Sequence, residues 1–299
     1  GYGVTPSTVC SVEEVLDLGY VLAREKATST FKVQNTSTLT LQYSIHLDSL
    51  SPTRDKDCQR FPSFVSSLRR TELVETENCN GVSVFSVLPT EGEIDAGKSQ
   101  DFIVTFSPDH EGLYCSECLK VVLFGKKTAH VIQLKGAARD RPMFVEGGVP
   151  LDVPIESLAV TLPLSLQKAL KEGTVLPLIA SHSMKSILLL LEHTEGENCL
   201  VPAMTELKVG AIQTAQFASK KNVEFRFDNL SHLQEKGFTV EPVKGKVDRG
   251  QVKCISVCWV PPADFDANAP LIETAFLTLN GDVKESYRIL FVATVLSAP

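Results

Sequence analysis

The segment from Gly92 to Ser99 matches the spacing of the phosphate-binding Walker A motif, including the Lys98–Ser99 pair that completes it. In a working motif a buried strand precedes the loop and a helix follows it, because the helix N-terminus holds the phosphates. Here residues 101–106 alternate between apolar and polar like a strand, and the acidic side chains in and beside the loop would repel a triphosphate. We therefore expect a turn that binds no nucleotide.

Two pairs of cysteines have spacings that resemble those of zinc sites: Cys115 with Cys118, and Cys254 with Cys258. The pairs lie far apart in the chain, and His110 is the one histidine near either of them at ligand spacing. Four ligands would therefore have to come from different domains. Buried structural thiols are the better interpretation, and we predict neither a metal site nor a cofactor.

Motifs for hydrolytic catalysis are missing from the sequence. The six histidines are scattered, and there is no Gly-x-Ser-x-Gly elbow or His-Glu-x-x-His helix. Catalytic triads can still assemble from distant residues, so this absence is only suggestive. Asn35 and Asn229 begin glycosylation sequons, but each closes an apolar strand, where a short amide bonds its own backbone and starts a turn. We predict no catalytic residues.

Alternation with a period of two is the main pattern of the chain. At 223–227 three apolar residues alternate with charged ones, which places the apolar groups on one face of a strand. Clusters of turn residues separate such runs, and many short strands between turns are typical of antiparallel sandwiches. The fold class predicted is all-β. The same alternation recurs at 39–45, 101–106 and 287–295.

The chain also repeats its elements in order. A strand containing glycine is followed by a strand ending in Asn, a Phe-x-Val-x-Pro strand, two glycines and two more apolar strands. A repeat of this length indicates tandem domains rather than a solenoid. The alignment pairs Gly19 with Gly210, Asn35 with Asn229, and Pro89 with Pro242.

This ordered series resembles the ASH, or Hydin-type, domain, a cytosolic immunoglobulin-like β-sandwich related to the major sperm protein and to the PapD pilus chaperone. Every motif of the pattern is present over residues 10–138. The second copy, 205–297, departs from it: Trp259-Val-Pro261 replaces Phe-x-Pro, and the final glycine is absent. The resemblance implies two tandem immunoglobulin-like sandwiches with little helix.

We predict a first sandwich at 1–138, carrying a polar, partner-facing insertion at 46–81 with Arg69 and Arg70 at its centre, and a second sandwich at 205–299. The intervening residues, 139–204, are too few for a third sandwich. We expect them to form an ordered linker with extra strands packed on the second domain, because their aliphatic runs must be buried. Its expected elements are a strand at 142–145, a helix at 165–172 and a buried strand at 187–191.

Composition and charge limit the classes of molecule that this chain is expected to bind. Hydrophobic residues make up 43% of the 299 and charged residues 22%, which is typical of a globular chain. The net charge is −7, shared as −3 up to Arg139 and −4 beyond it, so neither half has the basic surface that nucleic acid or an anionic membrane attracts. The eight cysteines are scattered without framework spacing, which favours reduced thiols in the cytoplasm.

Tandem ASH-type domains occur mainly in axonemal proteins, especially those of the central apparatus of motile cilia. The resemblance therefore implies a non-enzymatic scaffold of the axoneme, with other axonemal proteins as partners and only indirect contact with microtubules. The alternative is an adaptor or chaperone that binds peptides by adding a strand to an open sheet edge, as proteins of the major-sperm-protein and PapD kind do. The residues that contact partners are not assigned.

Overall fold

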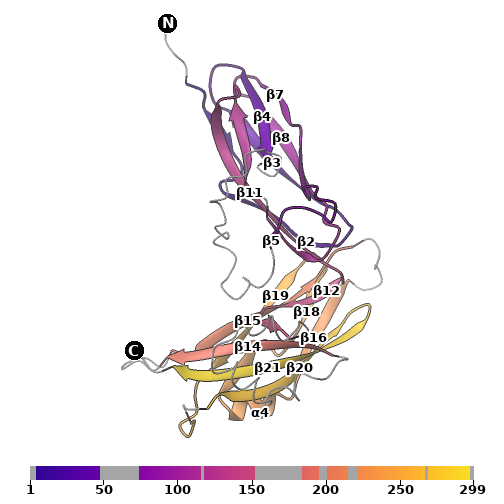
Figure 1. Ribbon diagram of the computed structural model, residues 1–299, viewed down its shortest axis with the longest axis vertical. Coiled ribbons are helices and arrows are strands. Elements are labelled where there is room, and N and C mark those ends of the chain that lie inside the picture. The colour runs from indigo at the N-terminus through magenta and orange to yellow at the C-terminus, as the bar shows by residue number, and fades with distance from the viewer. Residues whose placement is uncertain are drawn as a thin grey trace. The chain divides into compact units, whose positions relative to one another are not determined.

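The computed structural model describes residues 5–47, 74–115, 118–151, 184–194, 201–214, 221–266 and 269–296. Strands dominate these ranges, and α4 (Leu230–Glu235) is the only helix within them. The chain divides into two compact units, Gly1–Pro142 and Met143–Pro299, each built from two sheets (Figure 1). The predicted all-β class, with tandem sandwiches and little helix, is confirmed.

The first unit pairs a four-stranded sheet, β1-β3-β8-β6, with a sheet in the order β5-β9-β11-β10-β4-β7, to which β2 is added by parallel pairing with β11. The strands of the first sheet are β1 (Thr8–Cys10), β3 (Ala27–Asn35), β6 (Phe85–Leu88) and β8 (Ser99–Phe106). Those of the second are β2 (Val15–Leu22), β4 (Leu41–Leu47), β5 (Val74–Glu75), β7 (Glu91–Ile94), β9 (Gly112–Cys115), β10 (Leu119–Leu123) and β11 (Lys127–Arg139).

Alternation along these strands places apolar side chains between the two sheets, as the sequence predicts. Phe31 of β3 stacks on Phe102 of β8, with ring centroids 4.9 Å apart. Ile103, the next residue of β8, points the other way and is exposed. Leu39 differs from the expectation: it is exposed, because it lies in the turn before β4 and not on the strand.

The second unit repeats this plan with sheets in the orders β12-β15-β19-β17 and β13-β14-β21-β20-β16-β18. The strands of its first sheet are β12 (Met143–Glu146), β15 (Ala203–Ala211), β17 (Phe238–Glu241) and β19 (Val252–Trp259). Those of its second are β13 (Val149–Pro150), β14 (Lys185–Thr194), β16 (Asn222–Asp228), β18 (Lys244–Asp248), β20 (Leu271–Asn280) and β21 (Lys284–Leu296).

Trp259 belongs to the hydrophobic core of the second unit and is fully buried. Its ring meets Phe265 edge-on at 5.2 Å and lies 6.0 Å from Phe238, while its Nε1–H donates to the carbonyl of Lys236 at 3.0 Å. That bond satisfies the one polar atom of the buried indole. Phe225 of β16 belongs to the same core, as the alternation predicts.

Strands β14 and β21 are buried on both faces. Ile187 and Leu189 point into the core, whereas Leu188 packs in a second apolar cluster with Leu290 and Val292 of β21. The two strands run parallel. An uninterrupted aliphatic run is typical of a strand covered on both sides, so the prediction of a buried strand at 187–191 is confirmed.

Backbone pairing decides which strands of the two units correspond. Strand β2 runs parallel to the last strand of the first unit, and β14 runs parallel to the last strand of the second. The N–H of Gly97 donates to the carbonyl of Asn35 at 3.0 Å, and that of Gly250 donates to the carbonyl of Ala211 at 2.7 Å. Asn35 therefore corresponds to Ala211, and its predicted alignment with Asn229 is wrong.

The predicted alignment of Gly19 with Gly210 is also wrong, since Gly19 lies in β2 and Gly210 in β15, the counterpart of β3. A glycine beside an apolar strand is too common a pattern to identify one particular strand. From Pro89 and Pro242 onward the alignment is confirmed, because the strands that follow pair in the same way in both units.

Three strands, β12, β13 and β14, come from the segment 139–204 that the sequence sets apart from the second sandwich. Each pairs with a strand of that unit's sheets, and the unit itself begins at Met143. Of these, β12 and β14 are the counterparts of β1 and β2 in the first sandwich, because β12 pairs with β15 as β1 pairs with β3, and β14 runs parallel to β21 as β2 does to β11. The helix pattern at 165–172 and most of the insertion at 46–81, with Arg69 and Arg70, lie outside the described residues.

Candidate functional site

The Walker-like segment forms strand, turn and strand. Gly92 lies within β7 and Gly97 in the turn that leads into β8, where Gly97 has a φ of 72° and the N–H of Lys98 donates to the carbonyl of Asp95 at 3.0 Å. The side chain of Lys98 is exposed. Since Ser99 begins a strand and not a helix, the backbone N–H groups that cradle a phosphate do not converge here.

The two cysteine pairs do not come together with other ligands. Cys254 and Cys258 both lie on the outer face of β19, between inward residues such as Val257. Cys254 is exposed, so its interpretation as a buried structural thiol is wrong, whereas Cys115 is buried as expected. Within the described ranges neither pair belongs to a group of three or more candidate metal ligands.

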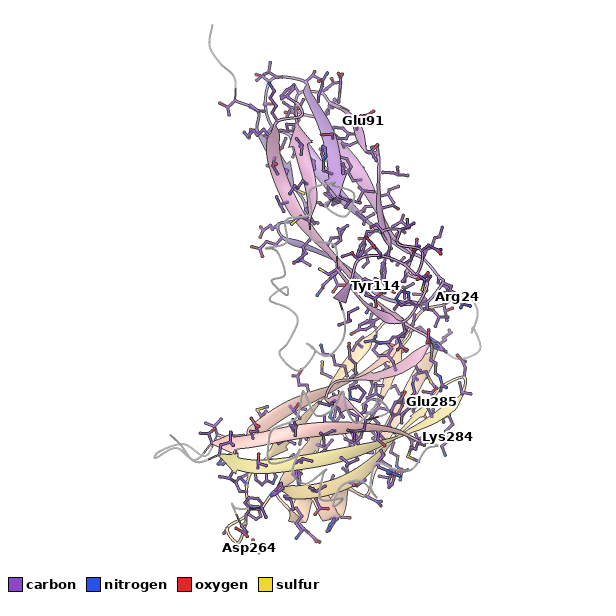
Figure 2. All side chains as sticks on the ribbon, viewed as in Figure 1. Arg24, Glu91, Tyr114, Asp264, Lys284 and Glu285 are labelled. Atoms are coloured by element: carbon purple, nitrogen blue, oxygen red, sulfur yellow. The ribbon has the colours of Figure 1, made fainter. Side chains whose placement is uncertain are left out.

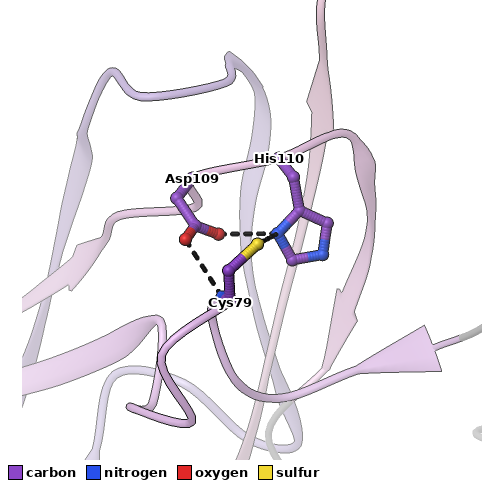
Figure 3. Close-up of side chains that lie close together, drawn as sticks. All are labelled: Cys79, Asp109 and His110. Atoms are coloured by element: carbon purple, nitrogen blue, oxygen red, sulfur yellow. Dashed lines mark hydrogen bonds and ion pairs between the residues drawn. The ribbon is translucent and has the colours of Figure 1, made fainter.

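A different group of side chains does meet, at one end of the first sandwich (Figure 3). Cys79 comes from the loop that follows β5, and Asp109 and His110 come from the loop between β8 and β9. The Nδ1 atom of His110 lies 2.6 Å from Oδ1 of Asp109 and 3.4 Å from Sγ of Cys79. On the other side of the ring, Nε2 of His110 lies 2.5 Å from Oε2 of Glu75.

The loop that carries Cys79 is held by its own backbone and by Asp109. The side-chain oxygen of Asn78 accepts from the N–H of Asn80 at 2.9 Å and from that of Val82 at 3.0 Å. The N–H of Cys79 itself donates to Oδ2 of Asp109 at 3.0 Å. These bonds are local side-chain-to-backbone contacts of the kind that Asn and Asp favour in turns, and they fix where the thiol points.

Tyr114 of β9, labelled in Figure 2, holds the second loop in place. Its hydroxyl donates to the carbonyl of His110 at 2.9 Å, and its ring meets the imidazole edge-on at 5.6 Å. Burial, followed by the charges of Glu75 and Asp109, raises the pKa of Tyr114 far above its ordinary value, so the hydroxyl keeps its proton and remains a donor.

The charges of the site are strongly coupled. The hydrogen bond with Asp109, and after it the bond with Glu75, raises the pKa of His110. The same bond with His110 lowers the pKa of Asp109. Loss of solvent and the nearby charge of Asp109 raise the pKa of the Cys79 thiol. A cation in this place, whether a proton or a metal ion, is therefore electrostatically favoured.

The sequence gives no spacing signal for this cluster. Cys79 and His110 are separated by 31 residues and lie in different loops, one after β5 and one between β8 and β9. The one hint in the sequence is the Asp109–His110 pair, which is followed by Tyr114. Ligand spacing in the sequence singles out only its histidine, as a residue near Cys115.

In the described ranges no helix has the length and apolar character required to cross a membrane. Two sheets per unit, with an early strand of each unit parallel to its last, define this chain as a tandem of immunoglobulin-like β-sandwiches. No family model matches it.

Two relatives that match all or nearly all of the chain in sequence are named as ciliary proteins. Over its whole length the chain is 42% identical, across 303 aligned residues, to human "Cilia- and flagella-associated protein 74", and over 99% of its length it is 39% identical, across 301 residues, to the mouse protein of that name. It spans 16% of the length of each. The chain is thus homologous to one part of cilia- and flagella-associated protein 74.

Solved structures of the same kind are similar at low identity. The ASH/PapD-like domain 7 of human CEP192 matches 45% of this chain and 86% of that domain, with 15% identity and a TM-score of 0.31. The CupB2 chaperone of Pseudomonas aeruginosa matches 94% of this chain and 98% of its own, with 11% identity and a TM-score of 0.25.

Proposed function

We propose that this chain is a non-enzymatic scaffold module of the ciliary and flagellar axoneme, within the central apparatus. The observation that carries the proposal is its 42% identity, over its whole length, to human cilia- and flagella-associated protein 74. Two folded sandwiches in series offer surfaces for several neighbours at once. Its partners are other axonemal proteins, and it reaches microtubules through them.

Two edge strands of the sheets, β18 and β7, favour the scaffold over the peptide-binding adaptor. An adaptor of that kind needs an open edge strand with unpaired backbone groups. In the second unit the edge strand β18 is five residues long and carries exposed Lys244, Lys246 and Asp248. In the first unit the edge strand β7 carries exposed Glu91 and Glu93. Short, charged edges are a common means by which proteins prevent strand addition.

The proposal is tested in ciliated cells that express the full-length relative with this segment replaced by an unrelated sandwich tandem of equal length. We expect a defined set of axonemal proteins to be lost from detergent-extracted axonemes, together with motility. An unchanged axoneme and normal motility would refute a scaffold role. Crosslinking of the intact protein separates the two functions: a fixed set of folded neighbours supports the scaffold, and many extended peptides paired with β7 or β18 support the adaptor.

A further inference from the structure

We propose that Cys79, Asp109 and His110 form a zinc-binding site that joins the loop after β5 to the loop between β8 and β9. Their ligand atoms all lie within 4.8 Å of one another (Figure 3). The ligands are Sγ of Cys79, Nδ1 of His110 and a carboxylate oxygen of Asp109, and the fourth position faces solvent. This proposal departs from the expectation of no metal site, which considered only cysteines that are close in sequence.

The distances between the ligand atoms suit the ion. With Zn–S near 2.3 Å and Zn–N near 2.0 Å, tetrahedral geometry places sulfur and nitrogen about 3.5 Å apart. Sγ of Cys79 and Nδ1 of His110 are 3.4 Å apart. Oδ1 of Asp109 is 2.6 Å from the same nitrogen, so it must move away by roughly 0.7 Å to take its place in that geometry, which rotation of the side chain supplies.

The imidazole is already oriented as a metal ligand. A histidine that binds a metal through one nitrogen nearly always donates its other N–H to a carboxylate, a carbonyl or water, which fixes its tautomer and ring plane. In this site Glu75 accepts at Nε2, so that Nδ1 faces Cys79 and Asp109. The carbonyl of His110 is held in turn by the hydroxyl of Tyr114.

The chemistry of the donors selects the kind of ion. A thiolate and an imidazole together favour borderline-soft ions such as Zn²⁺, whereas Ca²⁺ and Mg²⁺ require oxygen ligands. The thiolate of Cys79 and the carboxylate of Asp109 bring two negative charges, which balance the charge of the ion. Bound zinc would add a further link between two loops that the hydrogen bond from the N–H of Cys79 to Oδ2 of Asp109 already joins.

The test titrates the reduced, metal-free 299-residue chain with Co²⁺, followed by displacement with Zn²⁺. We expect one ion per chain and a thiolate-to-Co²⁺ charge-transfer band. Cys79→Ser should remove the band, and Glu75→Gln should weaken binding by about 10–100-fold, the usual effect of losing an outer-shell partner. Asp109→Asn keeps an acceptor for the N–H of Cys79 but loses the charge, and it should also weaken binding.

The matched control is Cys254→Ser, which removes an exposed thiol of the second unit and should leave the titration unchanged. Hydrogen exchange locates the ion: Zn²⁺ should slow exchange at 77–83 and 107–111, while the unfolding of the second unit, followed by the fluorescence of Trp259, stays the same. The proposal is overturned if Cys79→Ser, shown to be folded by circular dichroism, binds Co²⁺ as the wild type does, or if slowed exchange appears elsewhere.

Discussion

The side-chain amide of Asn35 donates to the backbone carbonyl of Ile94, 59 residues further along the chain, at 2.8 Å. The same nitrogen donates to the carbonyl of Leu39 at 2.6 Å, and the side-chain oxygen accepts from the N–H of Ser37 at 2.9 Å. Asn35 is completely buried. One residue thus closes β3, shapes the turn that follows it and ties both to the end of β7 in the other sheet.

Asn35→Ala should lower the free energy of unfolding of the first unit by about 2 kcal/mol or more, because it leaves buried backbone groups without partners. Hydrogen exchange of first-unit peptides during urea unfolding measures the loss. Asn229→Gly is the control: Asn229 is exposed, has a φ of 65° and makes no capping bond with its side chain, so the change should stay within about 0.5 kcal/mol. Equal losses of unfolding free energy at the two positions would contradict the structural role assigned to the buried side chain of Asn35.

Gly237→Ala should destabilise the second unit more than Gly250→Ala. Both glycines have positive φ, 88° and 83°, so an alanine at either costs about 1–2 kcal/mol in backbone strain. At Gly237 the added methyl group also meets the carbonyl oxygen of Val260, whereas at Gly250 the nearest atom is the end of the Gln213 side chain, 3.6 Å away. The collision should add about 1–3 kcal/mol.

Urea unfolding followed by the fluorescence of Trp259, the single tryptophan, measures both glycine variants in the same unit. An equal loss of unfolding free energy for the two variants would mean that the backbone at Val260, after β19, moves aside at little cost. The predicted difference would then be wrong.

Phe225→Ala should cost about 3–5 kcal/mol, the usual range for a buried aromatic side chain. Phe225 is 2% exposed and lies in the second core. The same fluorescence measurement reports the loss. Val283→Ala, at a side chain that is 57% exposed, should change stability little. A cost below about 1 kcal/mol for Phe225→Ala would contradict its place in the core.

His130 should make the first unit less stable as the pH falls. Burial lowers its pKa in the folded protein below the ordinary value of 6.5, and its Nε2 lies 2.8 Å from the hydroxyl of Thr8. Just below pH 6.5 the unfolded chain therefore binds more protons than the folded one, so stability is lost as the pH falls through the folded pKa.

The variant His130→Gln should lose less stability between pH 7.5 and pH 5.5 than the wild type does. His110, whose raised pKa has the opposite effect, contributes to both proteins and cancels in the comparison. Hydrogen exchange of first-unit peptides at the two pH values is the measurement. Identical pH dependence in the two proteins would show that His130 is solvated.

The sequence by itself determined the all-β class, the tandem of sandwiches and most of the inward faces. Alternation with a period of two is a local property of the chain, so it identifies Phe102 and Phe225 as core residues without any knowledge of which strands pair. The correspondence of the strands that follow Pro89 and Pro242 could be predicted for the same reason.

Only the tertiary structure decided which strands correspond and which side chains meet. Asn35 and Asn229 each come at the end of an apolar strand, yet they do not correspond in the structure. Gly97 donates to the carbonyl of Asn35, whereas the equivalent Gly250 donates to that of Ala211. Hydrogen bonding between neighbouring strands depends on residues far away in the sequence. Cys79 and His110 meet because the loop after β5 and the loop between β8 and β9, each of which joins the two sheets, lie side by side. Local patterns carry no information about such loop contacts, which depend on how the two sheets pack.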